Sequence, residues 1–135
     1  MANEKGVLLV GELIRGTPAP ICYELLGVGR KLANALQEEL SILVIGDNVS
    51  ADTAKDLIAS GADRVYTVSH PLLAQYHPDS YAAAVEKAAK EKAPNIILMG
   101  RTEAGQDLAP MISYRLRTGL SVDCMDLRID PETKE

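Results

Sequence analysis

Val7-Leu8-Leu9-Val10 is a run of four apolar residues, the pattern of a strand that is buried on both faces of a sheet. Three further strand-forming runs follow along the chain: Ile42-Leu43-Val44-Ile45, Val65-Tyr66-Thr67-Val68 and Ile96-Ile97-Leu98-Met99. Continuous apolar strands are typical of parallel sheets, because helices cover both faces of such sheets. The four runs therefore predict an α/β fold.

Segments with helical spacing separate the predicted strands. The first helix is indicated by apolar residues that recur every three or four positions, at Ile21, Leu25, Val28, Leu32 and Leu36. A short helix is predicted to start at a cap, Ser50 or Asp52, and to reach residue 60, where Gly61 follows. Two more helices are predicted, one from Pro78 to about Pro94 and one over 107–117.

A fifth strand with more interrupted apolar residues is predicted over 120–127. Because crossovers between parallel strands are right-handed, few strand orders remain possible. We predict a Rossmann-like open sheet of five parallel strands in the order 3-2-1-4-5, with helices on both faces. We expect one α/β domain over 1–130 and a truncated tail or linker over 131–135.

The composition excludes several classes of protein. Lys and Arg number 14 and Asp and Glu 19, which gives a net charge of −5, so nucleic acid and anionic membranes are poor partners. No apolar run approaches the ~20 residues of a membrane span, and the first residues resemble neither a signal nor a transit peptide. With only two cysteines the chain has no disulfide framework, and we expect a soluble, reduced, cytoplasmic protein.

A ligand of an open parallel sheet binds at the carboxyl ends of the strands, where the strand order reverses. In the predicted order this crevice lies between the first and fourth strands, beside the loops 12–20 and 100–107. The carboxylates that could approach it belong to Glu12, Glu103, Asp107 and Asp123. They fit catalytic groups or solvated rim charges equally well, but no nucleophile or base pair accompanies them.

Gly100-Arg101-Thr102-Glu103-Ala104-Gly105 has the Gly-x₄-Gly skeleton of a phosphate loop. Gln106 and Asp107 stand where such a loop needs Lys and Ser or Thr, so Asp107 is better interpreted as a favourable charge at a helix N-terminus. That helix end could still hold an anion, and Gly100, Thr102 and Gly105 are the candidate binding residues. The corresponding alternative is a free-standing AMP- or ATP-binding module of the universal-stress type, although its tighter glycine spacing is missing.

The histidines and cysteines give no strong signal of a chemical role. His70 and His77, with Asp79 nearby, lack the spacing of a metal site, and we predict no metal. Cys22 follows a proline-rich loop at a helix start, where a thiolate could be stabilised, and Cys124 lies in an apolar strand. For both thiols a buried structural role is the favoured interpretation.

Several motifs, in this order, resemble the electron transfer flavoprotein α subunit family. They are Gly6-Val-Leu-Leu-Val-Gly-Glu12, Glu24-Leu-Leu-Gly-Val-Gly-Arg-Lys-Leu-Ala33, Gly61-Ala-Asp-Arg-Val-Tyr66, Tyr76-His-Pro-Asp-Ser-Tyr-Ala-Ala-Ala84, Gly100-Arg-Thr-Glu-Ala-Gly-Gln-Asp-Leu-Ala-Pro110 and Leu116-Arg-Thr-Gly-Leu-Ser-Val-Asp-Cys124. The family typically has Arg where Gln106 and Met111 stand, so two cationic positions beside the 100–107 loop are lost.

The resemblance implies an αβ heterodimer that passes electrons from dehydrogenases, such as the acyl-CoA dehydrogenases of fatty acid β-oxidation, to a quinone reductase or another acceptor. The FAD of the family lies mainly in a C-terminal domain, so this segment alone is expected to hold no FAD and to be no enzyme. The resemblance gives it the structural role of contacting the β subunit. Crevice position and motif membership mark Thr102, Gln106, Asp107, Arg115 and Asp123 as candidate interface residues, each of which could instead be a helix cap or a solvated charge.

Overall fold

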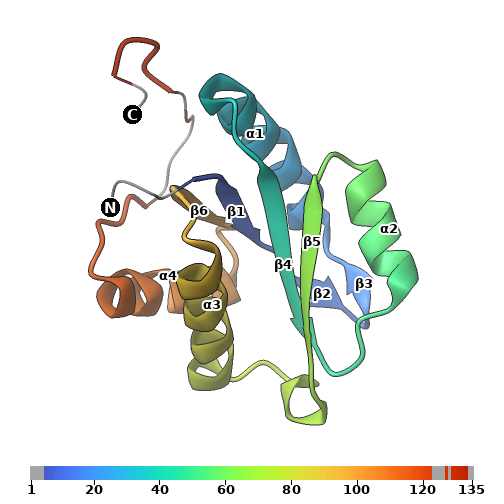
Figure 1. The fold of residues 1–135 in the computed structure, drawn as a ribbon. Coiled ribbons are helices and arrows are strands. Elements are labelled where there is room, and N and C mark those ends of the chain that lie inside the picture. Colours follow the sequence, from blue (N-terminus) through green and yellow to red (C-terminus); the bar gives the residue numbers. More distant parts are fainter. Residues whose placement is uncertain (1–4, 123–126, 128, 134–135) are drawn as a thin grey trace.

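A computed structural model describes residues 5–122, 127, 129–133, and its core is a parallel sheet of four strands (Figure 1). The strands lie in the order β5 (Arg64–Ser69), β4 (Leu40–Gly46), β1 (Val7–Val10), β6 (Ile96–Met99). In sequence order these are the third, second, first and fourth predicted strands. Their type and their order are thereby confirmed.

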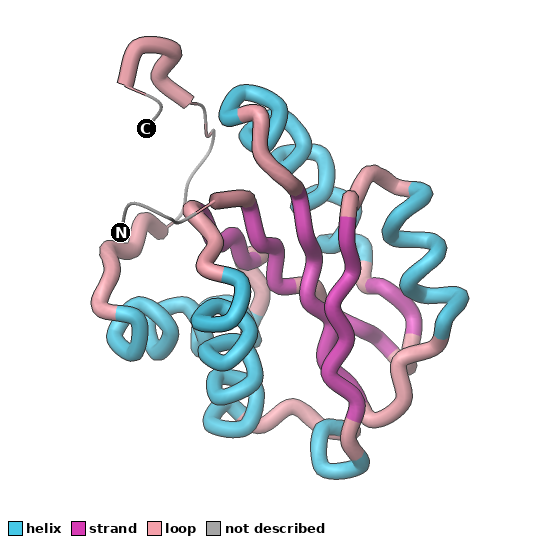
Figure 2. The backbone as a smooth tube through the Cα atoms, viewed as in Figure 1, coloured by secondary structure: helices cyan, strands magenta, loops and turns pink. Residues whose placement is uncertain are grey.

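Helices cover both faces of the sheet, as predicted (Figure 2). α1 (Pro20–Leu36) and α2 (Ala51–Ala59) pack on one face, and α3 (Pro78–Lys92) and α4 (Glu103–Leu116) on the other. Because side chains alternate along a strand, β1 serves both cores: Val7 and Leu9 face α1, whereas Leu8 and Val10 face α3 and α4. No helix among the described residues combines the length and the apolar character needed to cross a membrane.

The fifth strand is the part of the fold prediction that the structure corrects. Within the described part of the chain, residues 120–122 and 127 belong to no strand, and 123–126 lie outside it (Figure 2). The sheet therefore has four described strands instead of five. Of the described residues that follow, Leu127 and Ile129 pack against the core on the α1 side of the sheet.

Two small elements interrupt the loops. β2 (Leu13–Ile14) and β3 (Thr17–Pro18) form an antiparallel hairpin whose two turn residues, Arg15 and Gly16, have φ of 53° and 80°. Positive φ at both turn positions matches the twist of a tight hairpin. A single 3₁₀ turn, η1 (Pro71–Leu73), follows β5.

The buried face of α1 differs from the predicted stripe at one position. Leu25 and Leu32 are buried as expected, but Val28 is 38% exposed. The buried side of the helix instead includes Cys22 and Gly29. A Cβ on Gly29 would lie 2.7 Å from Leu40 Cδ1, so the glycine allows the helix to approach the sheet closely.

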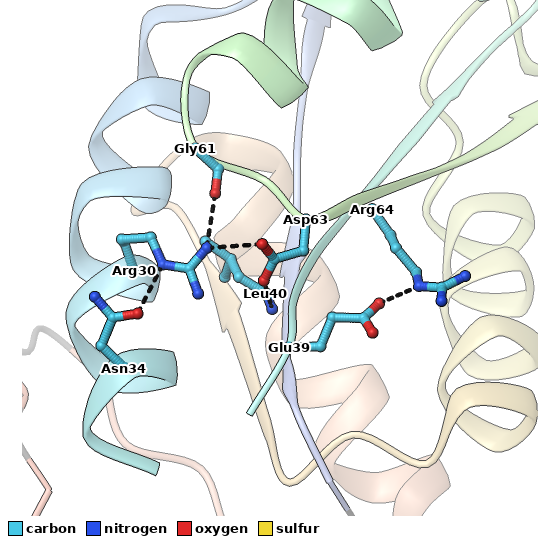
Figure 3. Close-up of polar contacts among 7 residues, drawn as sticks. All are labelled: Arg30, Asn34, Glu39, Leu40, Gly61, Asp63 and Arg64. Atoms are coloured by element: carbon cyan, nitrogen blue, oxygen red, sulfur yellow. Dashed lines mark hydrogen bonds and ion pairs between the residues drawn. The ribbon is translucent and has the colours of Figure 1, made fainter. Parts of the chain in front are cut away.

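A polar network ties three segments together at the amino ends of the strands (Figure 3). Arg30 Nη1 on α1 donates to Gly61 O at 3.0 Å and to Asp63 Oδ1 at 3.1 Å. Asp63 Oδ2 in turn accepts the Leu40 N–H at the start of β4, at 2.9 Å. Arg30 and the Leu40 amide hold the pKa of the Asp63 carboxyl below its usual value.

Candidate functional site

The candidate crevice lies at the carboxyl ends of β1 and β6, where the segments after these strands meet. Glu12 follows β1 and Thr102 follows β6, and Thr102 Oγ1 donates to Glu12 Oε2 at 2.5 Å. The adjoining cavity of about 150 Å³ is lined by residues of both segments, including Gly11, Glu12, Ala104 and Gly105. The position expected from the predicted strand order is thus where the chain brings the two segments together.

Thr102 is the N-cap of α4, because its Oγ1 also accepts the Gly105 N–H at 3.0 Å. The helix therefore begins at Glu103, four residues earlier than predicted, and residues 103–107 are not a loop. The interpretation of Asp107 as the charge at the helix N-terminus is wrong, since Glu103 is the acidic residue of the first turn. A threonine followed directly by an acidic residue was the sequence signal for this start.

Close packing explains why both positions of the Gly-x₄-Gly skeleton are glycine. A Cβ on Gly105 would lie 1.9 Å from the carbonyl oxygen of Gly100, and a Cβ on Gly100 would lie 2.3 Å from Ile21 Cγ1. The first turn of α4 is thus pressed against the end of β6, and β6 against α1. This close approach requires both glycines without any bound phosphate.

Carboxylates dominate the electrostatics of the crevice. Tyr76 Oη donates to Asp107 Oδ2 at 3.4 Å, and its pKa is raised by burial first and then by the negative charges of Asp107, Glu12 and Glu103. Neither Lys nor Arg is found among the described residues that line the cavity. A nucleotide or flavin phosphate placed in this cavity would meet the carboxylate of Glu12, which lines it.

The crevice therefore does not fit a nucleotide or FAD. Its volume of about 150 Å³ lies below the ~300–1,000 Å³ of ordinary ligand pockets. At the start of α4 the Gly105 N–H is already paired with the Thr102 hydroxyl, which in turn donates to the Glu12 carboxylate. The AMP- or ATP-binding alternative loses the site on which it depended.

Cys22 is buried and is not an activated thiol. Its Sγ accepts the Glu12 N–H at 3.3 Å and lies 3.2 Å from Glu12 O, to which it can donate. Burial raises the pKa of the Cys22 thiol, which excludes the thiolate that a helix start could have favoured. Cys124, the other candidate thiol, lies outside the described residues.

Both histidines stand at the starts of helical segments, and of the two only His70 caps its segment with its side chain. His70 Nδ1 accepts the Leu72 N–H at 3.1 Å, and His77 precedes α3 as its N-cap. Among the residues with described positions, His, Cys, Asp and Glu form no group of three that could hold a metal ion.

The structure describes four of the five predicted interface residues, and their surroundings differ. Gln106 and Asp107 are exposed on α4, but the Thr102 hydroxyl is held by its cap and by Glu12. Arg115 turns back to α3, where its Nη1 lies 3.5 Å from Glu86 Oε1. Asp123 lies outside the described residues.

Met111 stands where the family typically has Arg. Its side chain is half-buried and packs against the core under α3 and α4.

The outer face of α4 is a candidate surface that the sequence analysis missed. Tyr114 is 86% exposed and follows Gln106 and Pro110 at helical spacing, on the side opposite the buried Leu108 and Ile112. Two exposed apolar residues, Leu120 and Val122, follow the helix. The spacing of Tyr114 from Leu108 and Ile112 could have revealed this face.

Comparison with known proteins gives a consistent result along nearly the whole chain. The family model described as the electron transfer flavoprotein domain matches residues 7–134. "Electron transfer flavoprotein subunit alpha" of Thermoanaerobacterium thermosaccharolyticum is 43% identical over 130 residues, which cover 96% of this chain and 39% of that protein. "Protein FixB" of Azorhizobium caulinodans is 38% identical over 130 residues, 95% of this chain and 35% of that protein.

A third relative is named as a subunit of an enzyme complex. "Acryloyl-CoA reductase electron transfer subunit beta" of Anaerotignum propionicum is 41% identical over 108 residues, 80% of this chain and 29% of that protein. The chain thus spans about two fifths or less of the length of these curated relatives.

Proposed function

The chain belongs to the electron transfer flavoprotein family, and we propose that its residues 1–130 are the structural, partner-contacting α/β domain of an α subunit. In this proposal residues 131–135 lead out of the domain. The complete protein is an αβ heterodimer that carries electrons from dehydrogenases, such as acyl-CoA dehydrogenases, to a quinone reductase or another acceptor.

The observation that carries this proposal is the crevice that the chain fills with its own side chains. Glu12 and Thr102 hydrogen-bond to each other at the switch point of the sheet, and the described lining of the cavity there contains no Lys or Arg. FAD supplies the redox chemistry of the complete protein, and we place its binding outside these 135 residues. What remains for this domain is to hold the shape of the complex, a task that needs a rigid sheet and no acid–base residues.

We propose the outer face of α4 as the contact with the β subunit. Tyr114 offers a large aromatic side chain to a partner, and aromatic residues of this kind commonly carry much of the binding energy of an interface. Gln106 lies on the same face, and its carbonyl lacks an intrahelical partner because Pro110 has no N–H. Asp107 remains in the proposed contact as an exposed neighbour.

Co-purification with the β subunit of the same organism tests the proposal. We expect Tyr114→Ala to weaken the complex at least tenfold, because the aromatic contact is lost. Leu72→Ala is the matched control, since Leu72 is 75% exposed on the separate turn η1. The melting temperature of both variants should equal that of the parent chain. Absence of a complex with the parent chain, or equal affinity of the two variants, would contradict the proposed contact.

A further inference from the structure

A second pocket lies at the amino ends of the strands, at the end of the sheet opposite to the crevice. Its volume is about 350 Å³, and it is lined by the first residues of β1, β4 and β5 and by the segment around the end of α3. This volume is within the ~300–1,000 Å³ of ordinary ligand pockets. We call it the amino-end pocket, and its polar and aromatic lining consists of Lys5, Glu39, Ser41, Arg64, Tyr66 and Lys92.

The register of the sheet places the strand residues of this lining on one face. Ser41 is the register partner of both Leu8 and Arg64. Partners in register, and residues two apart on one strand, point to the same face of a sheet. Leu8 and Tyr66 pack in the core under α3 and α4, so Ser41 and Arg64 lie on that face as well. The pocket opens where α3 ends, at Lys92, and no longer covers this face.

Ser41 contributes a buried hydroxyl that lacks a partner. The residue is 9% exposed, and its side chain makes no hydrogen bond within the described part of the chain. Every fully enclosed side-chain oxygen or nitrogen in that part of the chain does have a partner, so the Ser41 oxygen must reach the pocket that the residue lines. Buried hydroxyl groups normally make at least one hydrogen bond, and Ser41 therefore points to an occupant of the pocket.

Two lysines hold positive charge at this pocket. Lys92 Nζ lies 4.6 Å from the centroid of the Tyr66 ring, a cation–π contact that keeps the ammonium group over the sheet. The Lys5 N–H donates to Ala93 O at 3.0 Å, so the backbone that carries Lys5 is fixed beside the end of α3. Neither lysine has an ion pair with any residue whose position is described.

Arg64 adds a third cation, of which only one edge is used. Its Nε pairs with Glu39 Oε1, whereas its two terminal nitrogens have no partner among the described residues (Figure 3). Glu39 is the one acidic residue in the described lining; the adjacent Glu38 accepts the Gly6 N–H at 2.9 Å and lies outside it. The lining thus carries three positive charges and one negative charge, in a chain whose net charge is −5. A local excess of this sign favours an anion.

We propose that the amino-end pocket binds a phosphate dianion, either free or as the phosphomonoester end of a small metabolite. The terminal nitrogens of Arg64 and the ammonium groups of Lys5 and Lys92 supply the positive charge, and the Ser41 hydroxyl donates a hydrogen bond. The three cations are exposed, so we expect a dissociation constant of about 1 mM. The pocket shares no residue with the crevice or with the proposed β-subunit contact, so the site is independent of both.

Amide NMR spectra of the 135-residue chain, titrated with inorganic phosphate at constant ionic strength, test the proposal. The signals of Gly6, Ser41 and Tyr66 should shift with one common dissociation constant, while those of Gly100 and Gly105 at the crevice stay in place. Sodium chloride at the same ionic strength should move none of them. A parallel titration with glycerol 3-phosphate separates the two sources of the dianion. Tighter binding of the monoester assigns the pocket to a metabolite, and equal or weaker binding assigns it to free phosphate.

Substitutions with matched changes of charge locate the site. Lys92→Gln should weaken phosphate binding about threefold, the size of one exposed ion pair, whereas Lys55→Gln, at an exposed position on α2, should leave it unchanged. Ser41→Ala should also weaken binding without lowering the melting temperature, because its hydroxyl has no partner in the described chain to lose. Glu39→Gln should tighten binding about threefold, since it removes the carboxylate of the lining, and unfolding cannot produce such a gain.

Four results would overturn the proposal. Equal shifts with phosphate and with chloride would reflect ionic strength alone. Equal weakening by Lys92→Gln and Lys55→Gln would reflect the overall charge of the chain. Shifts centred on Gly100 and Gly105 would place the anion at the crevice instead. An absence of any shift would remove the phosphate site and leave the proposed function of the domain intact.

Discussion

Asp63 is the residue on which three segments converge at the amino ends of the strands. It accepts hydrogen bonds from Arg30 on α1 and from the Leu40 amide of β4, and it directly precedes β5 (Figure 3). The carboxylate form makes both interactions, so folding favours the charged state. The neighbouring ion pair between Glu39 and Arg64 is more exposed and closes no such network.

Asp63→Asn should lower the free energy of unfolding at pH 7 by about 1 kcal/mol, the size of a net hydrogen bond to a partly exposed charged group. The folded pKa lies below the unfolded value of ~3.9, so this stabilisation is present above that value and is lost as pH falls through the folded pKa. Urea unfolding at pH 7 and near pH 3 measures the difference, which should shrink at the lower pH. Glu39→Gln is the control, with a change below about 0.5 kcal/mol. An equal effect of Asp63→Asn at both pH values would contradict the account.

Cys22 should react slowly with iodoacetamide in the folded chain. Burial raises the pKa of its thiol, so alkylation requires opening of the structure, and we expect a rate at least a hundredfold lower than in urea. Mass spectrometry of a Cys124→Ser background measures Cys22 alone. The same shift makes stability fall as pH rises from the unfolded thiol pKa, ~8.5, toward the raised folded value. Rapid labelling at pH 7 would show that the thiol is accessible.

At the scale of elements, α1 contains a matched pair of glycines. A Cβ on Gly29 would lie within 3.0 Å of both Leu40 Cδ1 and Leu9 Cδ2, whereas a Cβ on Gly27 would meet nothing within 4 Å. We expect Gly29→Ala to lower the free energy of unfolding by about 1–3 kcal/mol through overpacking. Gly27→Ala should instead stabilise by about 0.5–1 kcal/mol, because alanine is the better helix former.

Chemical denaturation of the two glycine variants measures both effects in one helix. The parent chain is the reference, and the variants differ only in which side of α1 gains a methyl group. The packing of α1 on the sheet would be contradicted if Gly29→Ala stabilised the chain. It would also be contradicted if Gly27→Ala lowered the free energy of unfolding as much as Gly29→Ala.

Elements with strong local signals could be predicted from the sequence. The four apolar strands and α2, with Ser50 as its cap, were found where expected. The β2–β3 hairpin was missed because strands of two residues leave no alternation to detect. The start of α4 was misplaced because two glycines in six residues are typical of a loop, whereas here tight packing requires them.

At the scale of the whole molecule, the strand order predicted where the crevice lies but not that side chains close it. The strand order placed the segments after β1 and β6 together, which is a general property of open parallel sheets. That Glu12 would close the crevice by bonding Thr102, 90 residues away, depends on side-chain geometry with no pattern in the sequence. The outer surface of α4 was not predicted either, although the helical spacing of Tyr114 from the buried Leu108 and Ile112 was a signal for it.

The closed crevice predicts that the 135-residue chain binds no nucleotide. Calorimetric titration with FAD, AMP and ATP should give no binding at micromolar concentration, because carboxylates repel the phosphates and the cavity is small. The complete flavoprotein, stripped of its flavin, is the positive control for FAD. Micromolar affinity of the short chain for any of the three ligands would refute the crevice argument.

The polar network and the crevice lie at opposite ends of the same strands, one at Leu40 and Asp63 and the other at Glu12 and Thr102. Because the two sites share no residue, the effects of substitutions at one end on stability should add to those at the other. The loops at the carboxyl ends can therefore vary while the Arg30–Asp63 network still holds α1, β4 and the start of β5 together.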